Sequence, residues 1–238
     1  MDFSPFEPAY ILSNGEKKYL RIRDLNRGLT GNKIIKNVFV GDNVKIEDYC
    51  VFGEIDERDS KNSLTIIGDN SIIRSHTVIY SGNQIGNKFE TGHGVLIRGK
   101  NKIGDNVSIG SHSDIEHNIK IGNNVIIHSG VFICEYSILE DDCWVGPYVI
   151  FTNTLHPKCN MAKKCMKGPI IEKGARVGAG AILLPGVTVG ENSLVGGGSI
   201  VTKDVSKGAV VIGNPAKKVG EVNKLKCVSG LMKKPYEN

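Results

Sequence analysis

The sequence is poor in aromatic residues, and it contains no long apolar run. Phe, Trp and Tyr make up 6% of the 238 residues, with a single Trp, which suits a core too slim for rings. No stretch reaches the roughly 20 apolar residues that a membrane-spanning helix needs. The first residues, Met1 to Ser4, include neither a basic start nor an apolar run, so we expect no signal peptide.

Cysteine and net charge are also modest. The six cysteines show no disulfide-like pattern, and since we expect no leader, they predict free thiols in a reducing cytoplasm. The formal net charge is +5, with lysines concentrated in residues 158–173 and 217–234. Such runs usually form solvated surface, and the alternative is contact with an anionic ligand.

What the sequence does have is an apolar residue at every sixth position, with one Thr in the series. A period of six matches neither the 3.6 of a helix nor the two of a half-buried strand, and it indicates a repeat protein. The central run comprises Ile67, Ile73, Ile79, Ile85, Thr91, Ile97, Ile103, Ile109, Ile115, Ile121, Ile127, Ile133, Leu139, Val145 and Phe151. It continues upstream at Ile34, Val40, Ile46 and Phe52, and downstream at Ile171, Val177, Leu183, Val189, Val195 and Val201.

Each repeat predicts one short flat face, and three faces close a triangular coil. Residues 18 apart then stack directly, about 4.8 Å apart, which is the usual spacing of paired strands. The repeats predict about eight such coils. Gly, Asp and Asn are concentrated between the apolar positions, as in Gly104-Asp105-Asn106, where corners with positive φ favour Gly and Asn.

The repeat divides the chain into three parts. Residues 1–33 predict an N-terminal cap built on a hairpin over residues 10–22, and residues 34–215 form the coil. A polar insert at Glu54–Ser63 and a longer loop at residues 152–169, which we expect to protrude, interrupt the coil. Residues 216–238 predict a short helix and a tail.

Residues 34–215 resemble the hexapeptide-repeat acyltransferases. The resemblance implies an all-β fold, the left-handed parallel β-helix, although parallel crossovers are ordinarily right-handed. It also implies a homotrimer with active sites in the grooves between subunits. A β-helix that acts only as a non-catalytic scaffold remains an alternative, because fold alone does not settle function.

The spacing of 18 places His117, Glu135 and Asn153 on one corner of three consecutive coils. A polar column at a turn is common by chance. The segment Gly146 to Asn153 and its flanks, however, resemble the N-acetyltransferases that act on nucleotide-linked 3-amino sugars. This resemblance implies acetyl transfer from acetyl-CoA to the sugar amine, and it makes the three residues the amine-binding set.

The residue types suit that chemistry. A carboxylate such as Glu135 can hold an ammonium group, and an imidazole such as His117 can accept a proton near neutral pH. The amide of Asn153 can position the amine or the acyl carbonyl. His156, followed by Pro157 in the long loop, favours an alternative, since related sugar O-acetyltransferases carry a His-Pro here and use the His as their base.

Residues 171–219 resemble the coenzyme A-binding coils of hexapeptide acyltransferases. Gly178 and Gly196 are 18 apart, and their missing side chains would let a pantetheine arm lie against exposed backbone. We expect Lys203, Lys217 and Lys218 to meet the phosphates of the coenzyme.

Three further residues are candidates for the nucleotide part of the substrate. Arg74, His93 and Arg98 could contact a diphosphate, although the polarity of a protein surface explains them as well.

The histidine spacing leaves a metal alternative open. His76, His112 and His117 are similar to the zinc ligands of γ-class carbonic anhydrases, but their register in the repeat is one place later than expected. Cys159 and Cys165 have a spacing unusual for zinc. We therefore expect no metal.

Overall fold

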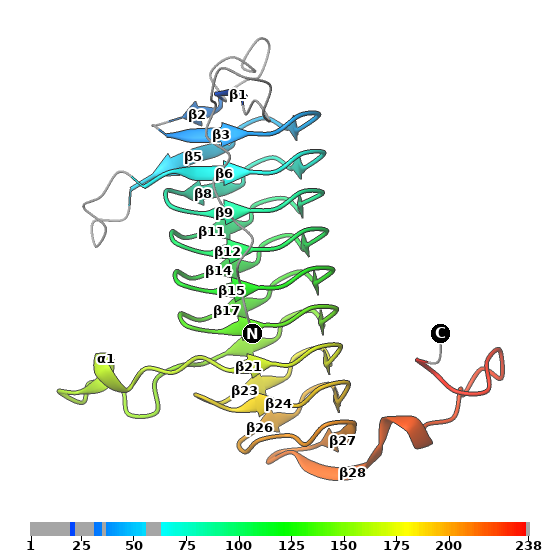
Figure 1. Cartoon of the computed structure of the whole chain (residues 1–238). Helices are drawn as coiled ribbons and strands as arrows, with labels where there is room; N and C mark the ends of the chain where they lie inside the picture. Colours follow the sequence, from blue (N-terminus) through cyan, green and yellow to red (C-terminus); the bar gives the residue numbers. More distant parts are fainter. Residues whose placement is uncertain (1–19, 22–30, 35–36, 56–62, 237–238) are drawn as a thin grey trace, which may run out of the picture.

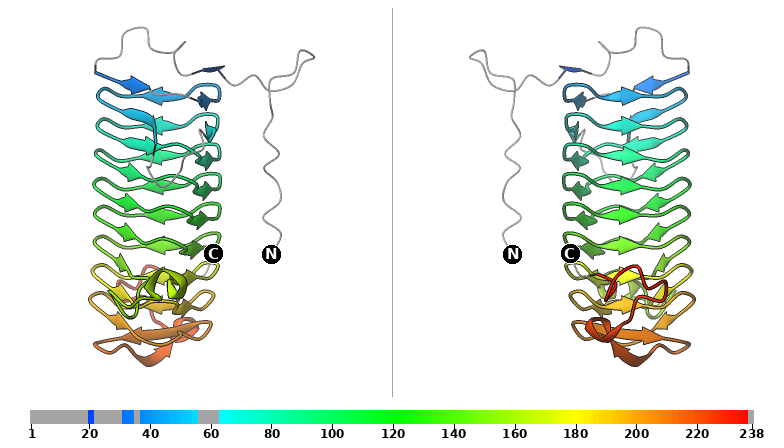
Figure 2. Two further views of the ribbon diagram at one scale, coloured as in Figure 1. Left: turned by 90° about the vertical axis from the view of Figure 1, so that its left-hand side faces the viewer. Right: turned by 90° about the vertical axis from the view of Figure 1, so that its right-hand side faces the viewer.

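The computed structural model describes residues 20–21, 31–34, 37–55 and 63–236. Its strands are two to five residues long and form three sheets; apart from the strands at the two ends of the column, every third strand along the chain is a parallel neighbour. Lys102 pairs with Lys120 and Ile103 with Ile121, so residues 18 apart stack as predicted. The coils form a straight column (Figures 1 and 2). The predicted parallel β-helix is confirmed.

Three sheets make up the column. Sheet I contains β1 (Leu20–Arg21), β3 (Val38–Val40), β6 (Thr65–Ile67), β9 (Gln84–Ile85), β12 (Lys102–Ile103), β15 (Lys120–Ile121), β18 (Ile138–Leu139), β21 (Ile170–Ile171) and β24 (Thr188–Val189). Sheet II contains β4 (Lys45–Ile46), β7 (Ile72–Ile73), β10 (Glu90–Thr91), β13 (Ser108–Ile109), β16 (Ile126–Ile127), β19 (Trp144–Val145), β22 (Arg176–Val177), β25 (Leu194–Val195), β27 (Ala209–Ile212) and β28 (Lys217–Glu221). Sheet III contains β2 (Lys33–Ile34), β5 (Val51–Glu54), β8 (Val78–Tyr80), β11 (Leu96–Ile97), β14 (Asp114–Ile115), β17 (Phe132–Ile133), β20 (Ile150–Phe151), β23 (Ile182–Leu183) and β26 (Ile200–Val201).

The sixth-position residues line the interior of the column. From Ile67 to Phe151 and from Ile171 to Val201 every one of them is buried, including Thr91. Ile46 is only partly buried, near the N-terminal end of the column. Burial of this continuous apolar stripe provides the main driving force for stacking the coils.

The chain passes from sheet I to sheet II at edge I–II, then to sheet III at edge II–III, and back to sheet I at edge III–I. Each edge is a tight turn. At edge I–II, Asn106, Asn124 and Asn192 have φ between 55° and 56°, as the corner prediction requires. The same edge carries a side-chain ladder, in which Asp105 N donates to Asn123 Oδ1 at 2.8 Å and Asn123 N donates to Asp141 Oδ1 at 2.6 Å.

Two segments leave the column. Residues 152–169 protrude between β20 and β21 (Figure 1), and they include the one-turn helix α1 (Ala162–Cys165), which the sequence did not predict. The C-terminal helix predicted after residue 215 is reduced to the 3-10 turn η2 (Val222–Lys224). Residues 217–221 instead form β28, which pairs antiparallel with β27, because the last coil leaves an unpaired strand edge there.

The ends of the chain are described only in part. The predicted N-terminal hairpin and most of the insert at Glu54–Ser63 lie outside the described residues, except that β1 pairs antiparallel with β3. Among the described residues, no helix is both long and apolar enough to cross a membrane.

Candidate functional site

The structure brings the predicted amine-binding residues together at edge III–I. His117 Nε2 contacts Glu135 Oε1, and Asn153 Nδ2 donates to Glu135 Oε2 at 3.4 Å. The side chains of His117 and Glu135 are 17% and 15% exposed, so both are reachable but largely shielded. An imidazole, a carboxylate and an amide therefore form one continuous row across three coils.

Buried side chains fix this edge from behind. Asn101 is fully buried and accepts a hydrogen bond from Ile119 N at 2.8 Å, directly beside His117. Ser137 is also buried, and its hydroxyl donates to Cys134 O at 2.7 Å, next to Glu135 in the chain. Burial raises the pKa of the Cys134 thiol to about 11, so this cysteine is not a thiolate nucleophile near neutral pH.

Two residues extend the row on its N-terminal side. Glu116 Oε2 lies 3.3 Å from His117 Nδ1, and Glu116 Oε1 lies 3.1 Å from Arg98 Nε. Glu116 was not among the residues predicted from the sequence, and Arg98 was predicted to contact a diphosphate. The signal was present, because Arg98 and Glu116 carry opposite charges 18 positions apart and must stack on one edge.

A third carboxylate lies close to this pair. Asp114 is half-buried, and its Oδ1 has no hydrogen-bond partner among the described residues. Burial raises the pKa of the Asp114 carboxyl, the negative charge of Glu116 raises it further, and the Arg98 guanidinium lowers it. With Asp114, Glu116 and Glu135 near one guanidinium and one imidazole, the site favours a cationic ligand.

His156 does not join the row. It is exposed in the protruding loop, and its ring makes no hydrogen bond or ion pair within the part of the chain that the structure describes. Its predicted role as a base would therefore require the loop to contact a substrate or another subunit.

The other predicted substrate residues lie at edge II–III. Arg74 Nη2 is 2.7 Å from Glu90 Oε1 and Arg74 Nη1 is 3.2 Å from Glu47 Oε1. His93 Nδ1 lies 2.9 Å from Ser75 Oγ. Since two carboxylates already neutralise Arg74, it is a poor phosphate ligand. The structure thus splits the predicted group, with Arg98 on a different edge.

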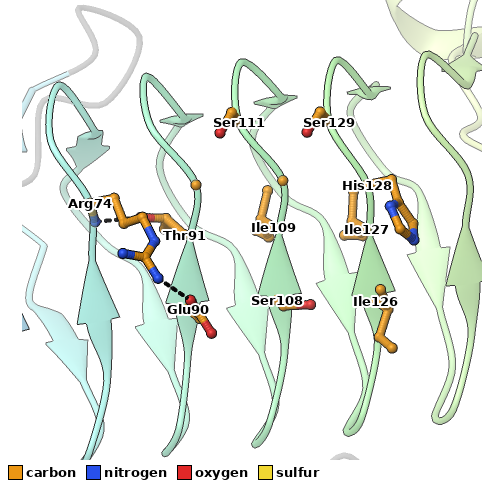
Figure 3. A pocket seen from close by; sticks show the side chains of 12 residues that line it. Arg74, Glu90, Thr91, Ser108, Ile109, Ser111, Ile126, Ile127, His128 and Ser129 are labelled. Carbon is orange, nitrogen blue, oxygen red and sulfur yellow. Dashed lines mark hydrogen bonds and ion pairs between the residues drawn. The ribbon is translucent and has the colours of Figure 1, made fainter.

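Arg74 and Glu90 line a shallow cavity of about 320 Å³ on the outer face of sheet II. Figure 3 shows their paired side chains, with Ser108, Ile126 and His128 further along the same face. The His128 ring packs edge-on against Trp144, with 4.8 Å between centroids. The cavity therefore combines hydroxyl groups with an apolar end.

Gly178 and Gly196 also lie at edge II–III, but the reason for each glycine differs from the predicted one. A Cβ on Gly178 would lie 2.5 Å from Gly197 N, and one on Gly196 would lie 2.7 Å from Ile212 Cγ1. Their missing side chains thus permit the close approach of the next layer rather than opening a channel for a ligand.

The open backbone lies beside them. Gly180 and Gly198, with φ of 68° and 67°, have no atom within 4 Å of an added Cβ. The N–H groups of Ala179 and Gly197 meet no acceptor among the described residues, and both residues are exposed. Unpaired N–H groups in a row along one edge are what an amide-containing arm or an oxyanion requires.

The three predicted phosphate-binding lysines are all exposed but are not together. Lys217 in β28 pairs in register with Ile212 in β27, and Ile212 in turn lies against Gly196, so Lys217 is one strand further from Gly196. Lys218 forms an ion pair with Glu221. Lys203 follows β26 and lies at edge III–I, on the other side of sheet III.

The structure separates the histidines of the carbonic-anhydrase alternative. His76 and His112 lie at edge II–III, whereas His117 lies at edge III–I of the same chain. Among the described residues, one group has donor atoms close enough to share a metal ion, namely Glu116, His117 and Glu135, within 4.8 Å of one another. His156, Cys159 and Cys165 form no such group.

Sequence comparison agrees with the fold. A family profile described as "Bacterial transferase hexapeptide (six repeats)" matches residues 102–135 and 168–203. The UDP-N-acetylglucosamine acyltransferase of Campylobacter jejuni superposes with a TM-score of 0.68, at 19% identity, over 80% of this chain and 73% of that chain. The chain thus contains hexapeptide repeats of this family in two segments and shares the fold of this acyltransferase. Its left-handed parallel β-helix is thereby confirmed.

Curated relatives match shorter segments. The galactoside O-acetyltransferase of Lactococcus lactis subsp. lactis is 38% identical over 82 residues, which are 33% of this chain and 40% of the relative. A 2,3,4,5-tetrahydropyridine-2,6-dicarboxylate N-acetyltransferase of Staphylococcus aureus is 46% identical over 56 residues, 24% of this chain and 23% of the relative. The chain spans less than half the length of these relatives, so they do not fix its acceptor.

Proposed function

We propose that this protein is an acyl-CoA-dependent N-acyltransferase, most simply an N-acetyltransferase, that acylates the amino group of a nucleotide-linked amino sugar. Such sugars are precursors of surface polysaccharides and glycans. The observation that carries the proposal is the contact of His117 and Asn153 with Glu135 at edge III–I. The activities of the two curated relatives support acyl transfer, although they differ in acceptor.

The charge of the site favours an amine over a hydroxyl. An amino sugar arrives largely as an ammonium ion, and Glu135 can pair with it while Asn153 Nδ2 holds the second carboxylate oxygen. The neighbouring Asp114 and Glu116 add negative potential at short range. A neutral hydroxyl would gain nothing from this excess of carboxylates.

The residues of the row also suit the proton transfers. After the ammonium loses one proton to water, the amine nitrogen attacks the thioester carbonyl, and the C–N bond forms as the C–S bond breaks. The new amide nitrogen must shed a second proton, which His117 can accept and the departing thiolate can finally take. Side chains of edge III–I thus bind, orient and deprotonate the acceptor.

Edge II–III supplies a binding surface for the acyl donor. The exposed N–H groups of Ala179 and Gly197 can pair with the amide carbonyls of a pantetheine arm, and one of them can hold the developing oxyanion. Lys217 lies at the C-terminal end of this row, where a coenzyme phosphate would fit. We include Lys203 and Lys218 only as secondary contacts, because one lies at edge III–I and the other is paired with Glu221.

A homotrimer would bring the two edges together. They flank sheet III, whose outer face exposes Phe132 and Ile150, 36% and 41% accessible and paired in register. An apolar strip on this face suits burial against another subunit. Edge III–I of one subunit would then face edge II–III of its neighbour, with both substrates in the groove between them. A cytoplasmic location also stays a prediction.

The decisive experiment measures release of the coenzyme thiol from acetyl-CoA with a panel of nucleotide-linked amino sugars. We expect turnover with at least one amine and none with its hydroxyl counterpart. Glu135→Ala should abolish turnover without changing the melting temperature, whereas His156→Ala should retain it. No turnover with any amino sugar would contradict the proposal.

A sugar O-acetyltransferase is the second candidate, favoured by the galactoside O-acetyltransferase among the relatives and by the exposed His156. A hydroxyl needs a general base, and a histidine on a protruding loop could reach across a groove. Turnover with a hydroxyl acceptor, lost in His156→Ala and retained in Glu135→Ala, would establish this function instead.

A further inference from the structure

Two tyrosines occupy equivalent corners of edge II–III. Tyr49 and Tyr148 have φ of 61° and 57°, a left-handed conformation that a bulky residue rarely adopts. Each ring covers a glycine of the preceding coil. A Cβ on Gly130 would lie 2.5 Å from Tyr148 Cδ1, and one on Gly31 would likewise meet the Tyr49 ring. The two corners therefore share a backbone conformation and a packing arrangement, and they can be compared directly.

The coil that follows is different at the two corners. Beside Tyr49 the corner holds His76, whose ring stacks on the tyrosine with 5.2 Å between centroids. Beside Tyr148 the corner holds Gly180, where an added Cβ would meet no atom within 4 Å. Accordingly, the exposed fraction is 52% for Tyr49 and 70% for Tyr148. Tyr148 is thus an exposed ring at the border of a stretch of the edge where the backbone is accessible.

Tyr148 closes this stretch on its N-terminal side. The open corners at Gly180 and Gly198 follow it, one and two coils further on. The N–H groups of Ala179 and Gly197, which meet no acceptor in the described part of the chain, lie on the same two coils. Because successive coils are about 4.8 Å apart, the ring lies only one coil from the first of these N–H groups. Any ligand that extends along the row toward the N-terminal end of the column therefore meets the ring.

The height of the amine-binding row determines which end of the donor reaches the ring. Asn153 lies on the same coil as Tyr148, and Glu135 and His117 lie on the two coils before it. In the proposed trimer, equivalent coils of neighbouring subunits lie at one height, because a threefold axis parallel to the columns relates them. The thioester must reach the amine at this height, so the acyl end of the coenzyme lies next to Tyr148.

We propose that Tyr148 is a specificity-determining residue that limits the acyl donor to short chains. An acetyl group ends before the ring, whereas a longer chain would continue along the edge into the corner of Gly130, which the ring already fills. The inference rests on the proposed function, because it takes edge II–III as the surface that binds the coenzyme. It adds no step to the transfer itself.

The main chain around Tyr148 fixes the ring at this place. Tyr148 N donates to Ser129 O at 3.0 Å, and Gly180 N donates to Pro147 O at 2.8 Å. Val149 is fully buried, and the fixed φ of Pro147 restricts the backbone directly before the tyrosine. A longer acyl chain would have to displace the ring from its packing over the preceding coil, and the cost of that displacement is the basis of the selectivity.

Calorimetry of donor binding tests the inference without any acceptor. The wild type should bind hexanoyl-CoA at least about tenfold more weakly than acetyl-CoA, since the added methylenes find no room. Tyr148→Gly should remove most of this difference, because glycine suits a φ of 57° and leaves the corner open. Tyr148→Phe keeps the ring and should discriminate as the wild type does, since the hydroxyl takes no part in the selection.

Tyr49→Gly is the matched control, because it removes the equivalent ring from the same edge, far from the donor surface. Its ratio of the two affinities should equal that of the wild type. Similar melting temperatures of Tyr49→Gly and Tyr148→Gly show that the coils stay folded in both. With an amino sugar as acceptor, kcat/KM for hexanoyl-CoA should rise at least about tenfold in Tyr148→Gly and should not change in Tyr49→Gly.

The outcomes separate the two claims. Equal affinity of the wild type for both donors, or a ratio of affinities that Tyr148→Gly does not change, overturns the role of Tyr148 whatever the acceptor is. Selection of acetyl-CoA that depends on Tyr148, in a protein that acylates no amine, supports this role and overturns the amine acceptor of the proposed function. A protein that binds neither donor overturns both.

Discussion

Edges I–II and III–I have the same backbone geometry, but their side chains form different kinds of interaction. At edge I–II the Asp and Asn side chains accept the backbone N–H of the preceding coil, as Asn123 does for Asp105, so the ladder is satisfied within the chain. On three successive coils of edge III–I lie Arg98, Glu116, His117 and Glu135. These side chains pair with one another, and the imidazole of His117 lies between the carboxylates of Glu116 and Glu135. The repeat determines which side chains are neighbours. The residue types then determine whether the side chains of an edge only satisfy the backbone or could also bind a ligand.

The largest expected effect is on kcat, and it distinguishes a glutamate at edge III–I from a glutamate at edge I–II. Glu135→Ala at edge III–I should lower kcat by about a hundredfold or more, because it removes the partner of the substrate ammonium. Glu140→Ala, which removes an acceptor of Lys173 N at edge I–II, should leave kcat within about twofold. Initial rates with saturating acetyl-CoA measure both. Equal losses would show that the edges do not differ in function.

The next effect concerns the fold rather than the chemistry. Gly178→Ala should lower the melting temperature by about 10 °C, since its Cβ would lie 2.5 Å from Gly197 N and rigid backbone must move. Gly180→Asn is the control, because no atom lies within 4 Å of its Cβ and Asn tolerates a φ of 68°. Calorimetry of the two variants checks the comparison. A Gly178→Ala protein as stable as the control would show that the glycine serves the ligand after all.

The sequence predicted much of this arrangement. Because the spacing of 18 fixes the stacking, it placed His117, Glu135 and Asn153 on one edge without knowledge of any contact. The same rule would have paired Arg98 with Glu116, had charge been followed as closely as the motif. The spacing of 18 could not predict that Glu47 pairs with Arg74. The insert after Glu54 separates these two residues by 27 positions along the chain rather than 18.

The C-terminal segment shows a second limit. Residues 217–221 have no repeat to define their conformation, and their pairing with β27 depends on an open strand edge that only the assembled column provides. Likewise, the reason for Gly178 lies in the backbone of the next layer, and a sequence pattern cannot distinguish a close approach from an exposed surface.

A smaller effect tests the ladder itself. Asn123→Ala should cost about 1 kcal/mol, because Asp105 N loses its acceptor at an exposed edge where water can partly replace it. The melting temperature should fall by about 3 °C, and kcat should not change. A measurable loss of activity would mean that edge I–II contributes to the site.

The smallest effect concerns pH. Burial raises the pKa of Asp114, so the folded protein binds this proton more tightly than the unfolded chain does, and that stabilisation is lost as the pH rises through the raised value. Asp114→Asn should therefore melt about 2 °C higher at neutral pH. The gain should vanish below the ordinary carboxyl value of 3.8. Melting curves across this range check the sign, and a variant less stable at neutral pH would contradict it.

One measurement tests the central claim most directly: acetyl transfer to a nucleotide-linked amino sugar and to its hydroxyl counterpart, by the wild type, Glu135→Ala and His156→Ala. We predict that the wild type and His156→Ala acetylate the amine, that Glu135→Ala does not, and that none acetylates the hydroxyl. Transfer to the hydroxyl alone, dependent on His156 and indifferent to Glu135, would contradict the assignment of edge III–I as an amine site.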